Sequence, residues 1–298
     1  MNFKICTYNI DGLPEELDLR ELPWLLKPLS WIYKWIKGTT KIKINDNLGR
    51  QDKTFEIGEY IGSNDFDLCG LQEDLNYHEV LKNGLPDSYK TASYFGGIDF
   101  KNLRWFPYPR FKCDGISLVF KDSRIKIVEE KRVKWKKSSG YFKGANDKLM
   151  EKGFKFYSLI LDSQVFLDLY IVHLDADFYD PLECPDVEKD IEARGSQLSQ
   201  LVDEIEKRNS GNPIIVIGDF NSSPFYSWDN KNIEEYFLEP LRRIPGTYVG
   251  EIIGEERGVN RIFFMNYLES FNQVKPKKCY YENTGLSDHK PFIAEIEI

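Results

Sequence analysis

Short apolar runs recur along the whole chain and are separated by polar segments rich in Gly, Asp, Asn and Ser. Val, Ile, Phe and Tyr dominate these runs, which is typical of β-strands that end at turn-forming residues. The pattern predicts strands over Phe3–Tyr8, Asp67–Leu71, Ile116–Phe120, Ile125–Val128, Phe156–Leu161, Val165–Val172, Ile214–Ile217, Ile262–Phe264 and Phe292–Ile298.

One segment, from about Pro185 to Arg208, has a helical pattern. Its apolar side chains recur on one face of a 3.6-residue period, its first turn is acidic, and Gly211 follows its end. Because strands outnumber helices, we predict an α/β fold in which two mixed β-sheets pack face to face with helices outside.

The composition suits a globular protein with a sizeable core. The 298 residues are 41% hydrophobic and 30% charged, and no apolar run is long enough to span a bilayer. The net charge of −8 argues against a general DNA-binding protein, which usually presents a basic face. Local lysine clusters at residues 131–137 and 275–278 weaken that argument without removing it.

The five cysteines form neither a disulfide framework nor a CxxC metal motif. Cys6 and Cys69 lie inside strand-like runs, where a thiol is most simply a small core residue. The first residues lack the apolar core of a signal peptide. We therefore expect a cytoplasmic or peripheral membrane protein, or a secreted one if a leader has been removed.

Polar residues follow or precede five of the predicted strands, where the packing of two sheets would bring them to one rim. Carboxylate and amide oxygens suit a hard cation such as Mg²⁺ better than zinc. The residues are Asn9 and Asp11 in TYNIDG, Glu73 in GLQED, His173 in VHLDAD, Asp219 and Asn221 in GDFN, and Asp288 and His289 in SDHKP.

Each fragment alone has a simpler interpretation. Asn, Asp and Gly favour turns, so TYNIDG and GDFN could be no more than strand-ending turns. A histidine such as His173 in an apolar strand is more often a core residue than a catalyst. The recurrence of such fragments at strand ends favours a site.

TYNIDG, LQE, the strand-ending His173, GDFN and SDH, in this order, resemble the endonuclease/exonuclease/phosphatase superfamily, whose fold is like that of deoxyribonuclease I. The resemblance extends from Asn9 to His289 and implies one domain over residues 1–298, folded as a four-layer α/β sandwich. It also implies a metal-dependent phosphodiesterase, with Mg²⁺ as the cofactor and Mn²⁺ as the alternative.

The resemblance implies a role for each matching residue. Glu73 would hold the metal with Asn9 beside it and Asp288 in support, and Asp219 would deprotonate the attacking water. Asn221 would hold that water or the phosphate, and Asn9 would also contact substrate. His289 would stabilise the phosphoryl oxygens or protonate the leaving group, and His173 would contact the phosphate, so that a cation and two imidazoles neutralise the developing charge.

The family fold does not decide the substrate. HLDA and NDKLMEKGF (Asn146–Phe154) resemble the neutral sphingomyelinase-like branch, whereas TYNIDG and RIFF resemble the tyrosyl-DNA phosphodiesterase and abasic-site nuclease branches as much. We expect a phospholipid headgroup hydrolase that acts as a monomer. A nuclease or DNA-end phosphodiesterase is the alternative, and a catalytically weak phosphoester-binding module is a third.

The stretch WLLKPLSWIYKWIKG (Trp24–Gly38) bears on this choice. Pro28 favours a helix over Leu29–Lys37. One face would carry Leu29, Ile32, Tyr33 and Ile36 and pack on the protein, and nearly the opposite face would carry Trp31 and Trp35, with lysines between the two faces. The tryptophan face would contact a lipid surface, be covered by a neighbouring loop, or line the substrate cleft as a lid.

The segment GVNRIFF departs from the family pattern, because Asn260 stands where the family has an Asp that orients the histidine matching His289. An amide can accept the same hydrogen bond but brings no charge. We therefore expect modest activity.

Overall fold

The computed structural model describes residues 1–22, 27–37, 39, 41–43, 49–104, 109–139, 147–176, 187–221, 260–266 and 274–298. Within these ranges, the side chains of residues 29–30, 32, 43, 187–188, 260–266 and 275 are not described. The strands form two main sheets and two small two-stranded ribbons.

The first main sheet has six strands and joins both ends of the chain. The first strand, β1, pairs with the last strand antiparallel and with β4 parallel. In spatial order, the strands are β14 (Lys275–Tyr281), β15 (Phe292–Glu297), β1 (Asn2–Asn9), β4 (Leu68–Gln72), β8 (Ser117–Lys121) and β5 (Tyr89–Thr91).

The second main sheet has five strands, of which β11 and β12 are parallel neighbours. In spatial order, they are β13 (Asn260–Asn266), β12 (Pro213–Asp219), β11 (Val165–His173), β10 (Gly153–Leu161) and β9 (Ile125–Lys134). The small ribbons are β2 (Glu16–Asp18) with β3 (Lys41–Lys43), and β6 (Leu103–Arg104) with β7 (Arg110–Phe111).

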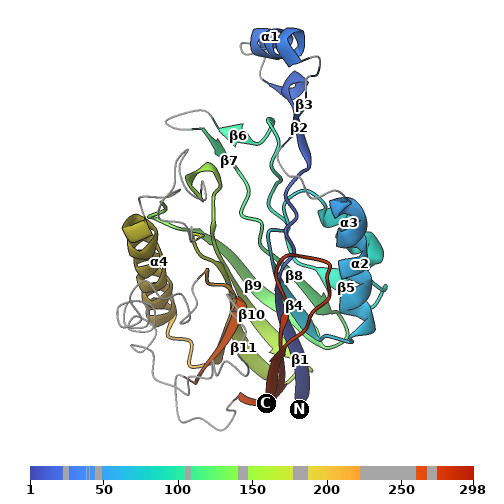
Figure 1. The fold of residues 1–298 in the computed structure, drawn as a ribbon. Helices are drawn as coiled ribbons and strands as arrows, with labels where there is room; N and C mark the ends of the chain where they lie inside the picture. Colours follow the sequence, from blue (N-terminus) through green and yellow to red (C-terminus); the bar gives the residue numbers. More distant parts are fainter. Residues whose placement is uncertain are drawn as a thin grey trace.

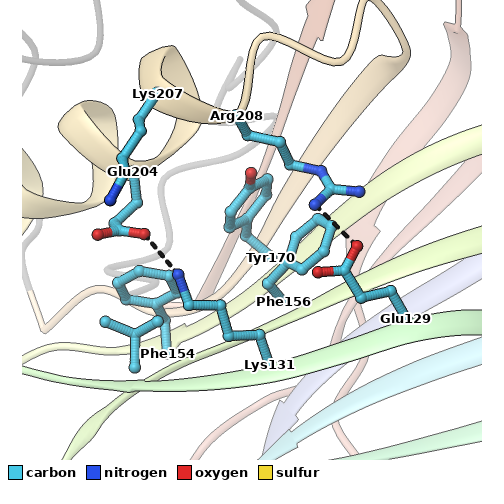
Figure 2. A pocket seen from close by; sticks show the side chains of 9 residues that line it. Glu129, Lys131, Phe154, Phe156, Tyr170, Glu204, Lys207 and Arg208 are labelled. Carbon is cyan, nitrogen blue, oxygen red and sulfur yellow. Dashed lines mark hydrogen bonds and ion pairs between the residues drawn. The ribbon is translucent and has the colours of Figure 1, made fainter.

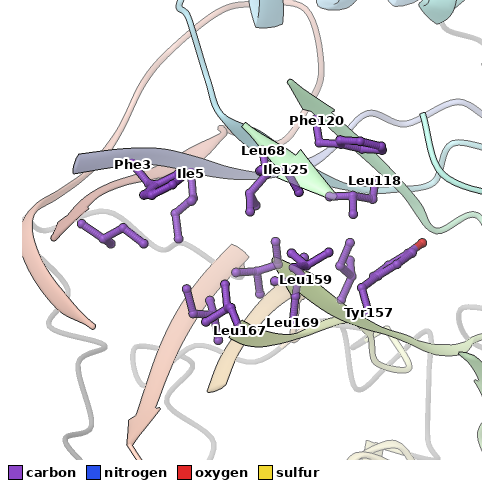
Figure 3. Close-up of a cluster of buried hydrophobic side chains, with 14 of the residues drawn as sticks. Phe3, Ile5, Leu68, Leu118, Phe120, Ile125, Tyr157, Leu159, Leu167 and Leu169 are labelled. Carbon is purple, nitrogen blue, oxygen red and sulfur yellow. The ribbon is translucent and has the colours of Figure 1, made fainter. Parts of the chain in front are cut away.

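The main hydrophobic core lies between the two sheets (Figure 3). Ile5 and Leu118 of the first sheet face Leu159 and Leu169 of the second, and all four are fully buried. Burial of each such side chain stabilises the fold by about 1.5–3 kcal/mol before the entropic cost of ordering it. Because strands place alternate side chains on opposite faces, the same strands also present a second apolar face outward.

Helices cover both outward faces (Figure 1). On the first sheet these are α2 (Arg50–Ser63) and α3 (His78–Gly84), whose Ile57, Ile61 and Leu81 pack with residues of β1, β4 and β8. On the second sheet it is α4 (Val187–Arg208), close to the helix predicted from about Pro185. The predicted fold class, two mixed sheets face to face with helices outside, is confirmed. Two short 3₁₀ helices, η1 (Leu19–Glu21) and η3 (Asp147–Leu149), lie in connections.

A pocket of about 260 Å³ lies between α4 and the second sheet. Phe156 and Tyr170 are among its aromatic lining, and ion pairs Lys131–Glu204 and Arg208–Glu129 close it (Figure 2). These pairs join the end of α4 to the edge strand β9.

The helix α1 (Lys27–Lys37) stands apart from the sandwich, at the tip of the β2–β3 ribbon (Figure 1). It begins just before Pro28, which lies in its first turn, where a missing N–H costs nothing. Trp31 is 74% exposed and Trp35 88% exposed, so neither is covered as a lid or core residue would be. Ile36 is also 63% exposed, which corrects the prediction that its face packs on the protein.

Within the part of the chain that the structure describes, no helix combines the length and apolar character needed to cross a bilayer. Cys6 and Cys69 are buried free thiols on neighbouring strands, as expected of core residues.

Candidate active site

The residues singled out in the sequence come from both sheets. Because β1 and β4 are parallel neighbours, Asn9 at the end of β1 pairs with Gln72 at the end of β4. Glu73 is the next residue after Gln72. The parallel pair β11 and β12 places His173 opposite Asp219. Because the carboxyl ends of parallel strands meet at one edge, each sheet supplies one half of the site.

The side chain of Asn9 joins the two halves. Its Nδ2 donates to Glu73 Oε1 at 3.0 Å and to Asp219 Oδ2 at 2.9 Å. The second of these bonds links residues 210 positions apart in the sequence. The fully buried amide therefore fixes two carboxylates from different sheets at one point.

The turns at the ends of β1 and β12 share one local structure. The Asp11 N–H donates to Asn9 Oδ1 at 3.1 Å, and the Asn221 N–H donates to Asp219 Oδ1 at 2.9 Å. Asp11 and Asn221 both have φ 47°, a left-handed conformation that Asn and Asp tolerate best. The turn interpretation of TYNIDG and GDFN is therefore correct, and the same turns aim the side chains into the site.

Two further backbone features lie at these strand ends. Glu73 has φ 57°, an uncommon value for a residue other than Gly, Asn or Asp, and such conformations cost about 1–3 kcal/mol. Gly218, directly before Asp219, has φ 151°, and a Cβ there would lie 2.0 Å from the Val172 carbonyl oxygen. The glycine of GDFN is thus required by the close approach of β11.

His173 lies behind the two carboxylates and is fully buried. Its Nε2 is 3.8 Å from Glu73 Oε1 and 3.9 Å from Asp219 Oδ2, and neither ring nitrogen has a hydrogen-bond partner among the described residues. Burial lowers the pKa of His173 well below its ordinary value, and the charge of Lys152 adds to this. A ring held neutral would contact a phosphate through a hydrogen bond, and the phosphate contact expected of His173 stays a prediction.

His289 approaches from the loop between β14 and β15. Its Nδ1 is 4.0 Å from Asp219 Oδ2, and its side chain is 22% exposed. Its backbone N–H donates to Ser287 Oγ, while that hydroxyl also donates to the Asn9 carbonyl oxygen at 2.9 Å. The loop is therefore tied to the end of β1, and His289 is the more accessible of the two histidines of the site.

Asp288 is exposed, and its Oδ1 lies 3.1 Å from Ser287 Oγ, where it competes with the Asn9 carbonyl oxygen for the single hydroxyl proton. Its role in metal binding stays a prediction.

Glu73 has the properties of a cation ligand. Burial raises the pKa of its carboxyl group, whereas Lys152 and the Asn9 amide oppose that rise. The Glu73 side chain is only 22% exposed, so its carboxyl group is costly to ionise. A cation bound against it would stabilise the ionised form. Among the described residues, no group of three or more His, Cys, Asp or Glu side chains is arranged to hold a metal ion by itself. An open oxygen site with one or two carboxylates, completed by water and substrate, fits Mg²⁺.

The sequence interpretation missed a buried ion pair beneath the site, Asp147–Lys152. Lys152 Nζ also reaches the Leu174 carbonyl oxygen at 3.4 Å, and Asn221 Nδ2 donates to the same oxygen at 2.9 Å. Burial would lower the pKa of Lys152, but nearby carboxylates, Asp147 first, outweigh it and raise that pKa. Lys152, directly before β10 in the segment NDKLMEKGF, was the signal available in the sequence.

These interactions belong to a network that holds the backbone after His173. Trp135 Nε1 donates to the His173 carbonyl oxygen at 2.8 Å, and the Ala176 N–H donates to Asp147 Oδ2 at 2.8 Å. The Asp175 N–H donates to Gln197 of α4 at 3.0 Å. Because buried backbone groups need partners, side chains of several elements fix this segment.

Asn260 begins β13, and its backbone pairs with that of Asp219. Its side chain lies outside the description, so the expected effect on His289 stays a prediction.

The sequence profile of the Endonuclease/Exonuclease/phosphatase family matches residues 6–239, most of the chain. The chain belongs to this family. It is therefore a hydrolase that acts on phosphoester bonds, in a family whose members are mostly metal-dependent. No curated protein sequence matches the chain significantly.

Solved structures share the fold at low sequence identity. TDP2 from D. rerio, humanized by 14 mutations, is 15% identical with a TM-score of 0.62, covering 100% of this chain and 99% of that one. A mutant of β toxin from Staphylococcus aureus with bound magnesium ions is 15% identical with a TM-score of 0.61, covering 99% of each chain. A mannosyl-6-phosphatase from Bacteroides thetaiotaomicron is 14% identical with a TM-score of 0.56, covering 99% of this chain and 100% of that one.

Proposed function

We propose that the protein is a Mg²⁺-dependent phosphodiesterase that hydrolyses the headgroup phosphoester of a phospholipid, as a sphingomyelinase-like enzyme. The observation that carries the chemistry is the Asp219 carboxylate, which Asn9 orients 4.0 Å from His289. The observation that favours a lipid is the exposed pair Trp31 and Trp35, through which we propose peripheral contact with a membrane.

The geometry supports the following roles in this proposal. Glu73 would hold the metal with Asn9 beside it, and Mg²⁺ would supply charge stabilisation for the phosphoryl oxygens. Asp219 accepts a proton from water as the water oxygen attacks phosphorus. The bond from phosphorus to the leaving oxygen breaks, and His289 gives that oxygen a proton.

The remaining residues bind and position substrate in this proposal. Asn221 is held by the Leu174 carbonyl oxygen through Nδ2, which leaves its Oδ1 to hold water. His173 offers a neutral N–H to the phosphate side of the site. Asp288, which is exposed, would support metal binding by Glu73 and Asn9.

A nucleic-acid phosphodiesterase is the second candidate, because TDP2 complexed with a single-strand DNA product is among the similar structures. The net charge of −8 disfavours long contacts with a phosphate backbone, although it does not prevent cleavage at a DNA end. A cytoplasmic or peripheral membrane location stays a prediction.

The proposal is tested by turnover of sphingomyelin, a lysophospholipid and abasic DNA, each with Mg²⁺, Mn²⁺ or EDTA. We expect hydrolysis of a phospholipid that EDTA abolishes and Mg²⁺ restores, and that His289→Ala lacks. Faster cleavage of DNA than of any lipid would select the second candidate. Saturable binding of a phosphoester without turnover would instead identify a binding module.

A further inference from the structure

The unit formed by α1 and the β2–β3 ribbon presents an apolar surface that the rest of the described protein does not cover. Trp31, Trp35 and Ile36 are 74%, 88% and 63% exposed, and they are among the most exposed large hydrophobic residues described. Figure 1 shows α1 beyond the end of the sandwich, on top of the ribbon. Burial of a Trp side chain removes roughly 150–250 Å² from water, so a partner that covers this surface gains substantially.

The charge around these residues is of one sign. Residues 24–43 contain five lysines and no Asp or Glu, in a chain whose net charge is −8. Lys34 and Lys37 lie exposed in the second half of α1, and neither makes an ion pair with another described residue. The surface is therefore both aromatic and cationic. It is complementary to a partner that has an anionic outer layer over an apolar interior.

The base of the unit has the opposite charge. Glu15, Glu16, Asp18 and Glu21 line a hollow beneath α1 together with Lys41. Lys41 pairs with Glu16 and Arg20 with Asp18, so these two cations are neutralised at the base, whereas Lys34 and Lys37 of α1 form no ion pair with a described residue. An anionic surface would attract the tip of the unit and not its base.

We propose that α1 docks on the surface of a bilayer that contains anionic lipid, with Trp31 and Trp35 at the depth of the headgroups and Lys34 and Lys37 against lipid phosphates. Trp prefers this depth because its ring is apolar and its N–H is polar, and Lys extends its ammonium group toward the headgroups. An interfacial helix of this kind lies in the plane of the membrane and does not cross it.

The position of the unit connects docking to the site. Figure 1 shows β1 running from the N terminus toward the end of the molecule from which α1 projects. Asn9 is the last residue of β1, so the candidate active site and α1 lie toward the same end. Docking thereby orients the site toward the lipid headgroups. This consequence rests on the proposed function, whereas the docking itself does not.

The test is co-sedimentation of the full-length protein with vesicles of phosphatidylcholine alone and with 30% phosphatidylserine, in EDTA so that nothing is hydrolysed. We expect binding to the anionic vesicles that weakens as salt is raised. Trp31→Ala with Trp35→Ala lowers the partition coefficient roughly a hundredfold. Lys34→Gln with Lys37→Gln lowers it about thirtyfold on the anionic vesicles.

Matched controls lie outside the unit. Phe166→Ala removes an aromatic side chain that is 51% exposed on β11, and Lys90→Gln with Lys126→Gln removes two exposed lysines. Both controls should bind vesicles as the unsubstituted protein does. An equal loss in controls and test variants would overturn the assignment to α1.

Three results would overturn the proposal: no binding of the unsubstituted protein to anionic vesicles, full binding of both test variants, or a concentration-dependent dimer in sedimentation velocity that the Trp variant abolishes. The last result would identify a second copy of the chain as the occupant. Vesicle binding without phospholipid turnover would reject the proposed substrate and leave the docking surface standing, so the two proposals fail separately.

Discussion

The candidate active site buries charged side chains, whereas the unit formed by α1 and the β2–β3 ribbon exposes apolar ones. In the site, charged side chains such as Asp219 and Lys152 are buried and held by hydrogen bonds from several elements. In α1, the large apolar side chains of Trp31 and Trp35 face solvent. Buried charge and exposed aromatic surface are both costly in a free monomer, so each indicates an interaction that lies outside folding.

The contrast indicates that the two regions have different roles, chemistry in the site and partner binding at α1. The side chains of the site are held by hydrogen bonds from residues far apart in the sequence. The α1 unit needs only a short helix and a ribbon, since its partner would complete it. Substitutions in the two regions should therefore change different measurable quantities.

The largest effect is expected at the centre of the site. His289→Ala should lower turnover by about 10²–10⁴-fold, since it removes the accessible proton donor, and Glu73→Ala should raise the Mg²⁺ concentration needed for activity. Turnover measured over a Mg²⁺ titration checks both. Glu79→Ala, on the exposed surface of α3, is the control. Near-full activity of either site variant would show that the site is assigned wrongly.

Lys152→Met should destabilise the protein by about 3–5 kcal/mol, because Asp147 would stay buried without its cation. The free energy of unfolding in urea measures this. Lys152→Met combined with Asp147→Leu should recover a large part of the loss, since the double variant leaves no unpaired charge. If the single variant were as stable as the starting protein, the pair would have no structural role.

Asn260→Asp should raise turnover a few-fold and shift the pH optimum upward, because a carboxylate near His289 would stabilise its protonated form. The gain is limited to a few-fold because Asp219 already lies 4.0 Å from His289. A pH–rate profile of both proteins is the measurement. Unchanged or lower turnover at every pH would show that Asp219 suffices.

Asp175 should make stability depend on pH. Burial raises its pKa to about 6, with the charge of Asp147 adding to the rise, above the ordinary value of 3.8. The folded protein therefore holds this proton more tightly, and the contribution to stability falls as pH rises from about 4 to 6. Asp175→Asn should remove that fall in urea titrations across the window. A slope equal to that of the unsubstituted protein would contradict the assignment.

The smallest effect on the free energy of unfolding is expected at the exposed tryptophans of α1. Trp31→Ala with Trp35→Ala should change the free energy of unfolding by less than about 0.5 kcal/mol, because the side chains are exposed. Turnover of a soluble short-chain substrate should stay the same. A loss of several kcal/mol would mean that the tryptophans pack on the protein.

The sequence predicted the central strands well and the edge strands poorly. β1 and β4 agree with the predicted strands to within a residue or so at each end. The prediction for β9 ended at Val128, whereas the strand continues to Lys134, and β14 was seen only as a lysine cluster. Both are edge strands, which have one open side in water and carry charges that hide the apolar pattern.

The sequence by itself determined which polar residues end the strands and what chemistry they suit, because strand period and turn propensity are local properties. The tertiary structure decided which of them meet. Asn9 and Asp219 are joined only because two sheets pack face to face, and Lys152 belongs to the site only because β10 lies beside β11. It also decided that Trp31 and Trp35 are exposed, since burial depends on what packs against a side chain, and no local pattern contains that information.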